Sequence, residues 1–243
     1  MSDIVIAAAK RTAIGSFLGQ FIGVPTPTLG AAAIQAAVEQ SGVAAADVSE
    51  VIMGCVLPAN LGQAPARQAS LAAGLPISVG CTTINKVCGS GMKAIMLGHD
   101  LIKAGSASVV VAGGMESMTN APHMLPGSRT GSKYGPITMV DHMAWDGLTD
   151  PYQGQAMGVF GEQCAAKYNF TREEQDAFAA ESVRRAQTAE ADGSFKADRV
   201  LVRRVIRSGE NLGDIFWELP LVEEYKESLK TPYADLYTIA AGG

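Results

Sequence analysis

One cysteine stands at the point where a strand-like segment gives way to a helix-like one. Cys88 follows the apolar run 81–87 and precedes Gly89, Ser90 and Gly91, and apolar residues then recur at helical spacing to residue 104. A thiol placed there faces the positive end of a helix dipole and free backbone N–H groups, which stabilise a thiolate. The layout is that of a strand–turn–helix nucleophile elbow with cysteine in place of serine. The alternative interpretation is a small buried hydrophobe, and the residues alone favour neither.

The other thiols and the imidazoles are weaker candidates for chemistry. Cys55 and Cys81 fall in strand-like segments, Cys164 falls on a helix-like one, and no cysteine spacing resembles that of a zinc site. The chain has three histidines, and each could pair with a thiolate only through tertiary contacts: His99, His123 and His142. We therefore take Cys88 as the leading candidate and expect no metal site.

The elements that must position Cys88 alternate in type through the first half of the chain. Hydrophobic periodicity predicts four strands, at 4–9, 51–57, 81–87 and 107–112, and three helices, at 28–40, 63–73 and 91–104. Strands that alternate with helices predict βαβ units and a mostly parallel sheet covered on both faces. The unbroken apolar runs 51–57 and 107–112 are typical of strands buried on both faces.

The pattern changes after the fourth strand. Prolines and glycines break up residues 119–158, and an irregular stretch of that length is usually a lid, a binding loop or an oligomer contact. Helices are expected again at 156–167 and from a capping box at 171–174 to about residue 191.

Composition and charge narrow the class of protein. The chain has 243 residues, of which 47% are hydrophobic and 18% charged, so it can bury a core and is not a disordered tail. The net charge of −5 argues against a nucleic-acid surface. Four cysteines at this length do not form a disulfide scaffold. With no apolar run long enough to span a bilayer and no leader-like N-terminus, we expect a soluble cytoplasmic protein that binds neither nucleic acid nor membrane.

Several motifs in order resemble the thiolase family, over residues 4 to about 199. Residues 6–12 are similar to the family's opening, and Thr83–Ala94 to its nucleophile motif. Val110–Met118 is similar to the motif after a family strand, and 146–150 with 157–158 resembles the family's coenzyme A loop. The resemblance implies a layered α/β core, the N-terminal half of the thiolase fold, with an inserted and mainly helical loop domain.

The resemblance also implies a function. Thiolases are acyltransferases, and Cys88 would take an acyl group as a thioester before a second coenzyme A substrate gives Claisen condensation or, in reverse, thiolytic cleavage. Coenzyme A and acyl-CoA would be substrates, with no permanently bound cofactor. Leu148 and Met157 match positions that line the pantetheine channel in the family, and Ala156 stands where some members carry histidine. Family members are homodimers or homotetramers, and 121–134 resembles the loop of the tetramer contact.

Other family motifs do not occur in this sequence. The family's second half carries an Asn-Glu-Ala-His-type motif, a Gly-His-Pro histidine that activates the nucleophile and a Cys-x-Gly-type motif whose cysteine moves protons. Their absence from the 243 residues predicts that Cys88 can be acylated but that full turnover is weak or absent. From about residue 207 the chain instead resembles a short segment of cytosolic leucyl aminopeptidase, with a helix expected at 222–230.

These observations predict three regions and leave two alternatives open. The regions are a nucleophile domain at 1–119, a loop domain for coenzyme A binding and oligomer contacts at 120–200, and a non-thiolase tail at 201–243. The first alternative to an acyltransferase is a non-catalytic, thiolase-derived binding or interaction subunit. A weaker one, from the tail alone, is a metal-dependent peptidase.

Overall fold

The structure is a computed structural model that describes residues 4–200, together with the backbone of 204–206 and 215–217. By its internal contacts the chain divides into two compact units: unit 1 comprises Met1–Pro122 and Arg199–Gly243, and unit 2 comprises His123–Asp198. The three regions predicted from the sequence, 1–119, 120–200 and 201–243, were defined by role, and those roles stay predictions. The helix expected at 222–230 lies outside the described residues.

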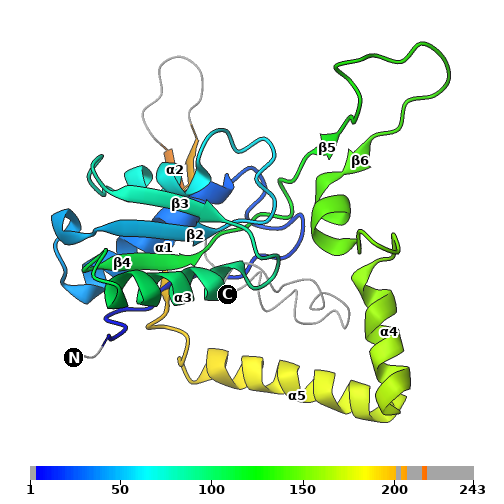
Figure 1. Cartoon of the computed structure of the whole chain (residues 1–243). Coiled ribbons are helices and arrows are strands. Elements are labelled where there is room, and N and C mark those ends of the chain that lie inside the picture. Colours follow the sequence, from blue (N-terminus) through cyan, green and yellow to red (C-terminus); the bar gives the residue numbers. More distant parts are fainter. Residues whose placement is uncertain (1–3, 201–203, 207–214, 218–243) are drawn as a thin grey trace. The chain divides into compact units, whose positions relative to one another are not determined.

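A three-stranded parallel sheet forms the centre of unit 1 (Figure 1). Its strands are β2 (Glu50–Gly54), β3 (Gly80–Ile84) and β4 (Val110–Gly114), in the order β3-β2-β4. Val51 of β2 is opposite Cys81 of β3 on one side and Val111 of β4 on the other. The predicted parallel sheet is confirmed, and the register places the C-terminal ends of all three strands at one edge.

Helices cover both faces of this sheet. They are α1 (Thr26–Ser41), α2 (Pro65–Ala72) and α3 (Ser90–Lys103), with a short 3₁₀ turn, η1, at Ala45–Asp47. Figure 1 shows α3 on one face of the sheet and α1 on the other. Pro27 in the first turn of α1 and Gly42 after its end, with φ 69°, are residues that typically mark helix boundaries. The predicted α/β architecture is therefore present in unit 1.

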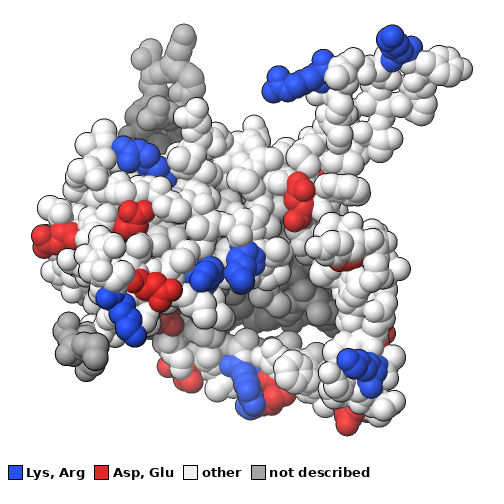
Figure 2. All heavy atoms as spheres, in the orientation of Figure 1, with Lys and Arg blue, Asp and Glu red and all other residues white. Residues whose placement is uncertain are grey.

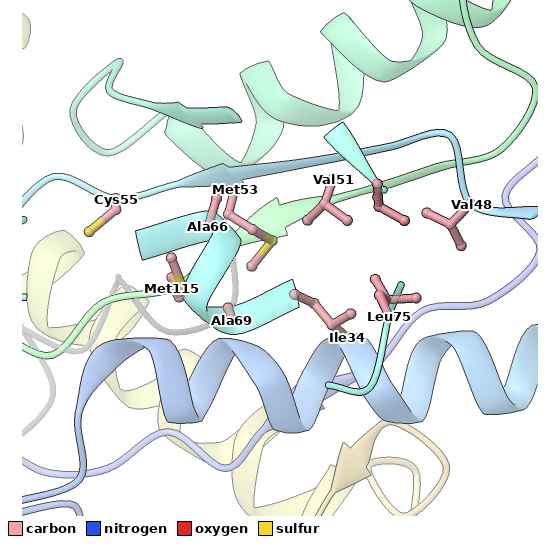
Figure 3. Close-up of a cluster of buried hydrophobic side chains, with 10 residues drawn as sticks. Ile34, Val48, Val51, Met53, Cys55, Ala66, Ala69, Leu75 and Met115 are labelled. Atoms are coloured by element: carbon pink, nitrogen blue, oxygen red, sulfur yellow. The ribbon is translucent and has the colours of Figure 1, made fainter. Parts of the chain in front are cut away.

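The main hydrophobic core lies between β2 and the pair α1 and α2 (Figure 3). Val51 and Met53 point from β2 toward Ile34 of α1 and Ala69 of α2, and all four side chains are buried. Small residues on α2 let the two helices and the strand approach closely. Burial of these apolar groups is the main stabilising term for unit 1.

The structure corrects the predicted strands in three ways. Residues 4–9 form no strand, and Val5 and Ile6 are 75% and 78% exposed, because parallel pairing begins only at β1 (Arg11–Thr12), opposite β7 (Arg199–Val200). The strands expected at 51–57 and 81–87 end three residues early, at Gly54 and Ile84, where the chain turns. The strand expected at 107–112 is β4 at Val110–Gly114, and it is only half-buried because it lies at the sheet edge.

Unit 2 contains short strands and two longer helices. The strands β5 (His123–Met124) and β6 (Val140–Asp141) pair antiparallel around the loop 125–139. A π-helical turn, η2 (Met143–Leu148), follows, and then α4 (Met157–Tyr168) and α5 (Arg172–Ala191). The predicted capping box is confirmed, since Thr171 and Glu174 exchange hydrogen bonds at the start of α5. Two further strands, β8 (Arg204–Ile206) and β9 (Ile215–Trp217), pair antiparallel in unit 1.

The surface is sparsely charged. On the face shown in Figure 2, side chains of both signs are interspersed with wide areas that carry neither. Within the described ranges, no helix combines the length and the apolar character needed to cross a bilayer.

Candidate active site

Cys88 lies in the turn between β3 and α3, and its side chain is exposed. Two consecutive turns surround it: the N–H of Gly89 donates to the carbonyl of Lys86 at 3.1 Å, and the N–H of Ser90 donates to the carbonyl of Val87 at 3.0 Å. Helix α3 begins at Ser90, so the thiol sits directly before the positive end of the helix dipole. The structure therefore places Cys88 in the predicted strand–turn–helix position, with its side chain exposed.

The side chain of Ser90 closes this turn. Its Oγ accepts a hydrogen bond from the N–H of Lys86 at 2.8 Å and donates one to the carbonyl of Val87 at 2.6 Å. Ser90 is buried, which protects both bonds from competing water. The backbone on the N-terminal side of Cys88 is thus bound to the first residue of α3.

Val87 has a backbone conformation that is unusual for its type. Its φ is 48°, in the left-handed region, which a β-branched residue rarely adopts. The N–H of Val87 donates to Oδ1 of Asn85 at 2.8 Å. Nothing in the sequence signals this conformation, because a valine in an apolar run predicts extended backbone.

The end of β2 packs closely against the start of α3. A Cβ built on Gly54 would lie 2.5 Å from Cβ of Ser90 and 2.9 Å from the nitrogen of Gly91. The N–H of Met115 donates to the carbonyl of Gly54 at 2.9 Å, which joins the loop after β4 to the same point. Glycine is required at 54 because any larger residue would displace the first turn of α3.

The buried carboxylate of Glu116 contacts the three residues that follow β2. Glu116 accepts hydrogen bonds from the N–H groups of Val56 at 2.6 Å and Leu57 at 3.1 Å, and the Cys55 thiol lies 3.7 Å from its Oε1. These bonds explain why β2 ends at Gly54, since the N–H groups of 56 and 57 point to the carboxylate and not to a strand. The sequence places Glu116 within the motif Val110–Met118 but did not lead to a prediction of this role, although an acidic residue directly after an apolar strand in a sparsely charged region is a usable signal.

The other thiol of this region is chemically inert by comparison. Burial raises the pKa of the Cys55 thiol to about 12, and the negative charge of Glu116 adds to the rise. Cys55 is therefore a protonated, buried thiol at neutral pH, whereas Cys88 and Cys164 are exposed.

The two residues expected to contact coenzyme A belong to unit 2. Leu148 ends η2 and Met157 begins α4. Thr149 and Ala156 form an antiparallel bridge, and the N–H of Asp150 donates to the carbonyl of Gln155 at 2.8 Å. Leu148 directly precedes this bridge and Met157 directly follows it in the chain. Cys88 lies in unit 1.

A buried histidine holds the turn that carries Leu148. His142 is buried, and its Nδ1 lies 2.6 Å from Oδ2 of Asp146. Thr149 adds a second hydrogen bond across the turn, from Oγ1 to the carbonyl of Ala144 at 2.7 Å. These contacts fix η2, and the sequence had left His142 without a role.

The remaining histidines take other places. His99 is on α3 about three helical turns beyond Cys88, and its Nδ1 lies 3.2 Å from Oδ1 of the neighbouring Asp100. His123 begins β5 in unit 2. His99 is thus too far along α3 to accept the proton of Cys88. Within the part of the chain that the structure describes, no cluster of histidine, cysteine and acidic side chains could hold a metal ion.

The parallel sheet and its covering helices define an α/β protein with an exposed cysteine at a strand–turn–helix junction. The sequence model of the family described as "Thiolase, N-terminal domain" matches residues 4–234, and the chain belongs to this family. The match extends beyond residue 199, the predicted end of the resemblance, and covers most of 201–243.

Known proteins similar to this chain carry acetyltransferase and thiolase names. An acetyl-CoA acetyltransferase of Pseudomonas aeruginosa is 51% identical over 213 residues, which are 88% of this chain and 54% of the relative. One from Schizosaccharomyces pombe is 48% identical over 86% of this chain and 53% of its own length. The chain thus spans about half the length of the curated relatives it matches.

A solved structure is similar as well. The crystal structure of Acat5 thiolase from Ascaris suum in complex with coenzyme A superposes with a TM-score of 0.80 at 41% identity, over 83% of this chain and 52% of that one. The predicted N-terminal half of a thiolase fold is therefore confirmed.

The tail requires a correction. No comparison supports a leucyl aminopeptidase segment from about residue 207, and the thiolase family model reaches residue 234. A likeness over a few tens of residues carries few constraints, because helix-forming acidic and leucine-rich segments recur in unrelated proteins. The peptidase alternative rested on that resemblance alone, so it has no further support.

Proposed function

We propose that this chain carries the nucleophile of an acetyl-CoA acetyltransferase and that Cys88 accepts the acyl group. The observation that carries the proposal is the position of Cys88, an exposed thiol in the turn directly before α3, in a chain about half identical to acetyl-CoA acetyltransferases. Cys164 is exposed too, but it lies within α4, away from any helix N-terminus. Exposure alone therefore does not distinguish the two thiols, and local geometry does.

The proposed first step is a transfer between two sulfur atoms. The Cys88 thiolate attacks the carbonyl carbon of acetyl-CoA, the C–S bond to coenzyme A breaks, and the proton lost by Cys88 ends on the coenzyme A thiol. The acetyl group is then held as a thioester on Cys88. In condensation, an acyl-CoA carbanion attacks this thioester, and the product 3-ketoacyl-CoA leaves with Cys88 free again. In thiolysis, Cys88 instead attacks a 3-ketoacyl-CoA, the C–C bond breaks to release acetyl-CoA, and coenzyme A then takes the remaining acyl group from Cys88.

Unit 2 would supply the contacts to coenzyme A. Leu148 and Met157 flank the Thr149–Ala156 bridge, and both are at least partly accessible. Their apolar side chains suit the pantetheine arm, and the His142–Asp146 pair would hold Leu148 in place. Coenzyme A is here a substrate and not a resident cofactor.

Multiple turnover would need general acid–base groups in addition to the Cys88 thiol. No histidine of unit 1 lies near the elbow, and general acid–base groups contribute about 10²–10⁴-fold each. We propose that acylation proceeds in this chain and that multiple turnover is slow. As in the family, the protein would act as a homodimer or homotetramer, and the loop 125–139 exposes Tyr134, Ile137 and Met139 for such a contact.

Mass spectrometry of the intact chain after incubation with acetyl-CoA tests the proposal. We expect one acetyl adduct, located on Cys88 by peptide mapping and released by hydroxylamine as a thioester. Cys88→Ser should abolish the hydroxylamine-sensitive adduct, whereas Cys164→Ser, the matched control at the second exposed thiol, should leave it unchanged.

Two results would count against this function. An adduct on Cys164 or on lysines alone would remove Cys88 from the reaction. No adduct, combined with stable binding to a full-length thiolase, would favour the non-catalytic binding subunit.

A further inference from the structure

The strongest unexplained feature of the elbow is the conformation of Val87, the residue directly before Cys88. Left-handed backbone is disfavoured for residues with a Cβ and especially for β-branched ones. Such a conformation persists where neighbouring groups hold it, and outliers of this type concentrate at functional sites. The groups that hold Val87 are therefore part of what presents the Cys88 sulfur.

Two side chains bind the backbone of Val87, one on each side. Its N–H donates to Oδ1 of Asn85 at 2.8 Å, and its carbonyl accepts from Oγ of Ser90 at 2.6 Å. The N–H of Ser90 reaches the same carbonyl at 3.0 Å. Both polar groups of the strained residue are thus satisfied in the left-handed conformation.

Ser90 is the firmer of the two contacts. It is buried, whereas Asn85 is exposed, and its Oγ also accepts from the N–H of Lys86. Its Cβ lies against Gly54 at the end of β2, so the hydroxyl is fixed by the sheet. An exposed asparagine bond competes with water and contributes less.

We propose that Ser90, assisted by Asn85, is a positioning residue that clamps Val87 in its left-handed conformation and so holds Cys88 at the N-terminus of α3. The inference deepens the proposed function and rests on Cys88 being its nucleophile. In this proposal neither the Ser90 nor the Asn85 side chain contacts the substrate. Release of the clamp would let Val87 relax to negative φ and carry the sulfur away from the helix end.

The test measures how fast iodoacetamide alkylates Cys88, by peptide mass spectrometry, with the exposed Cys164 as internal standard in the same molecule. For Ser90→Ala we expect alkylation of Cys88 to fall about tenfold relative to Cys164, the factor set by the left-handed penalty. Ser41→Ala is the matched control. Ser41 Oγ also donates to a carbonyl three residues back and accepts a backbone N–H, but at the end of α1. Its ratio should not change.

The decisive variant is Val87→Gly combined with Ser90→Ala. Glycine adopts positive φ without the steric penalty, so the double variant should recover to within about twofold of wild type. Rescue distinguishes a clamp on Val87 from general damage to folding, because Val87→Gly adds no packing. If Ser90→Ala does not fold, Asn85→Ala at the exposed side should show a smaller fall that Val87→Gly also reverses.

Several outcomes would overturn the clamp. Wild-type or faster alkylation in both Ser90→Ala and Asn85→Ala would do so, and so would a fall that Val87→Gly leaves in place. Iodoacetamide needs no acyl-CoA site, so the two proposals fail separately. If Cys88 of the wild-type chain is not acetylated but the variants are alkylated in the expected ratios, the acyltransferase proposal fails and the clamp stands. If Cys88 is acetylated but the variants are alkylated like the wild type, the clamp fails and the acyltransferase proposal stands.

Discussion

The two units of this protein are stabilised by different means. In unit 1, apolar side chains of β2, α1 and α2 share one buried core that includes Ile34, Val51 and Met53. In unit 2, no residue of η2, α4 or α5 is buried, although all three are fully described. Phe178 of α5 is 80% exposed.

Local contacts take the place of the core in unit 2. A capping box starts α5, and Glu181 forms ion pairs with Arg184 and Arg185 along its surface. Exposed contacts of this kind are worth little each, whereas burial of a core side chain is worth several times more. The proposed nucleophile is therefore carried by the unit with a buried core, and the expected coenzyme A residues by elements without buried side chains.

The largest expected effect tests the core of unit 1 against unit 2. Ile34→Ala should lower the free energy of unfolding by about 2–5 kcal/mol, because it removes buried methylene groups and leaves a cavity. Phe178→Ala, a larger truncation at an exposed position, should change it by less than about 0.5 kcal/mol. Urea denaturation followed by circular dichroism measures both. Equal losses would show that Phe178 is covered in solution and would end the contrast.

The second effect concerns the buried carboxylate of unit 1. Glu116→Gln replaces one of the two carboxylate oxygens with an NH2 group, which cannot accept the hydrogen bond from Val56 or Leu57 that this oxygen received, and we expect the free energy of unfolding to fall by about 1–3 kcal/mol. Glu39→Gln, on the exposed surface of α1, is the control and should be near neutral. An unchanged free energy of unfolding in Glu116→Gln would mean that water replaces the lost hydrogen bond.

Both results bear on what the sequence could predict. The elbow was predictable because a cysteine followed by two glycines and a serine interrupts a strand–helix transition. Helices α1, α3 and α5 were predictable to within two residues at their starts, because their apolar spacing, glycines and capping box are local signals. These features depend on neighbours in the chain.

The rest depended on partners distant in the sequence. The apolar run 4–9 has the composition of a strand, but composition does not say whether another strand supplies hydrogen bonds, and the described pairing begins at Arg11. Glu116 acts on residues about sixty positions earlier, and Gly54 meets Ser90 only in the folded sheet. The left-handed Val87 opposes its own propensity, so tertiary contacts alone explain it.

The third effect is confined to alkaline solution and again belongs to unit 1. Burial raises the pKa of Cys55 from its ordinary value of 9.0 to about 12, so between these values the unfolded chain releases the proton and the folded chain keeps it. The stabilising contribution is complete below pH 9 and is lost as pH rises toward 12. Free energies of unfolding measured over this range should fall more steeply in wild type than in Cys55→Ala. Parallel profiles would show that the folded thiol ionises normally.

The smallest effect tests whether local contacts alone stabilise unit 2. Thr171→Ala removes the Oγ1 that accepts from the N–H of Glu174 at 3.1 Å, and loss of such a cap costs about 1 kcal/mol. Because α5 has no buried residue, the loss should stay in that helix: its amides should exchange roughly fivefold faster, while those of β2 keep their rate. Thr188→Ala is the control, since the Thr188 hydroxyl donates back to the carbonyl of Arg184 within the helix and alanine favours helix. If Thr171→Ala also speeds exchange in β2, the two units unfold together and their difference in burial does not separate their stabilities.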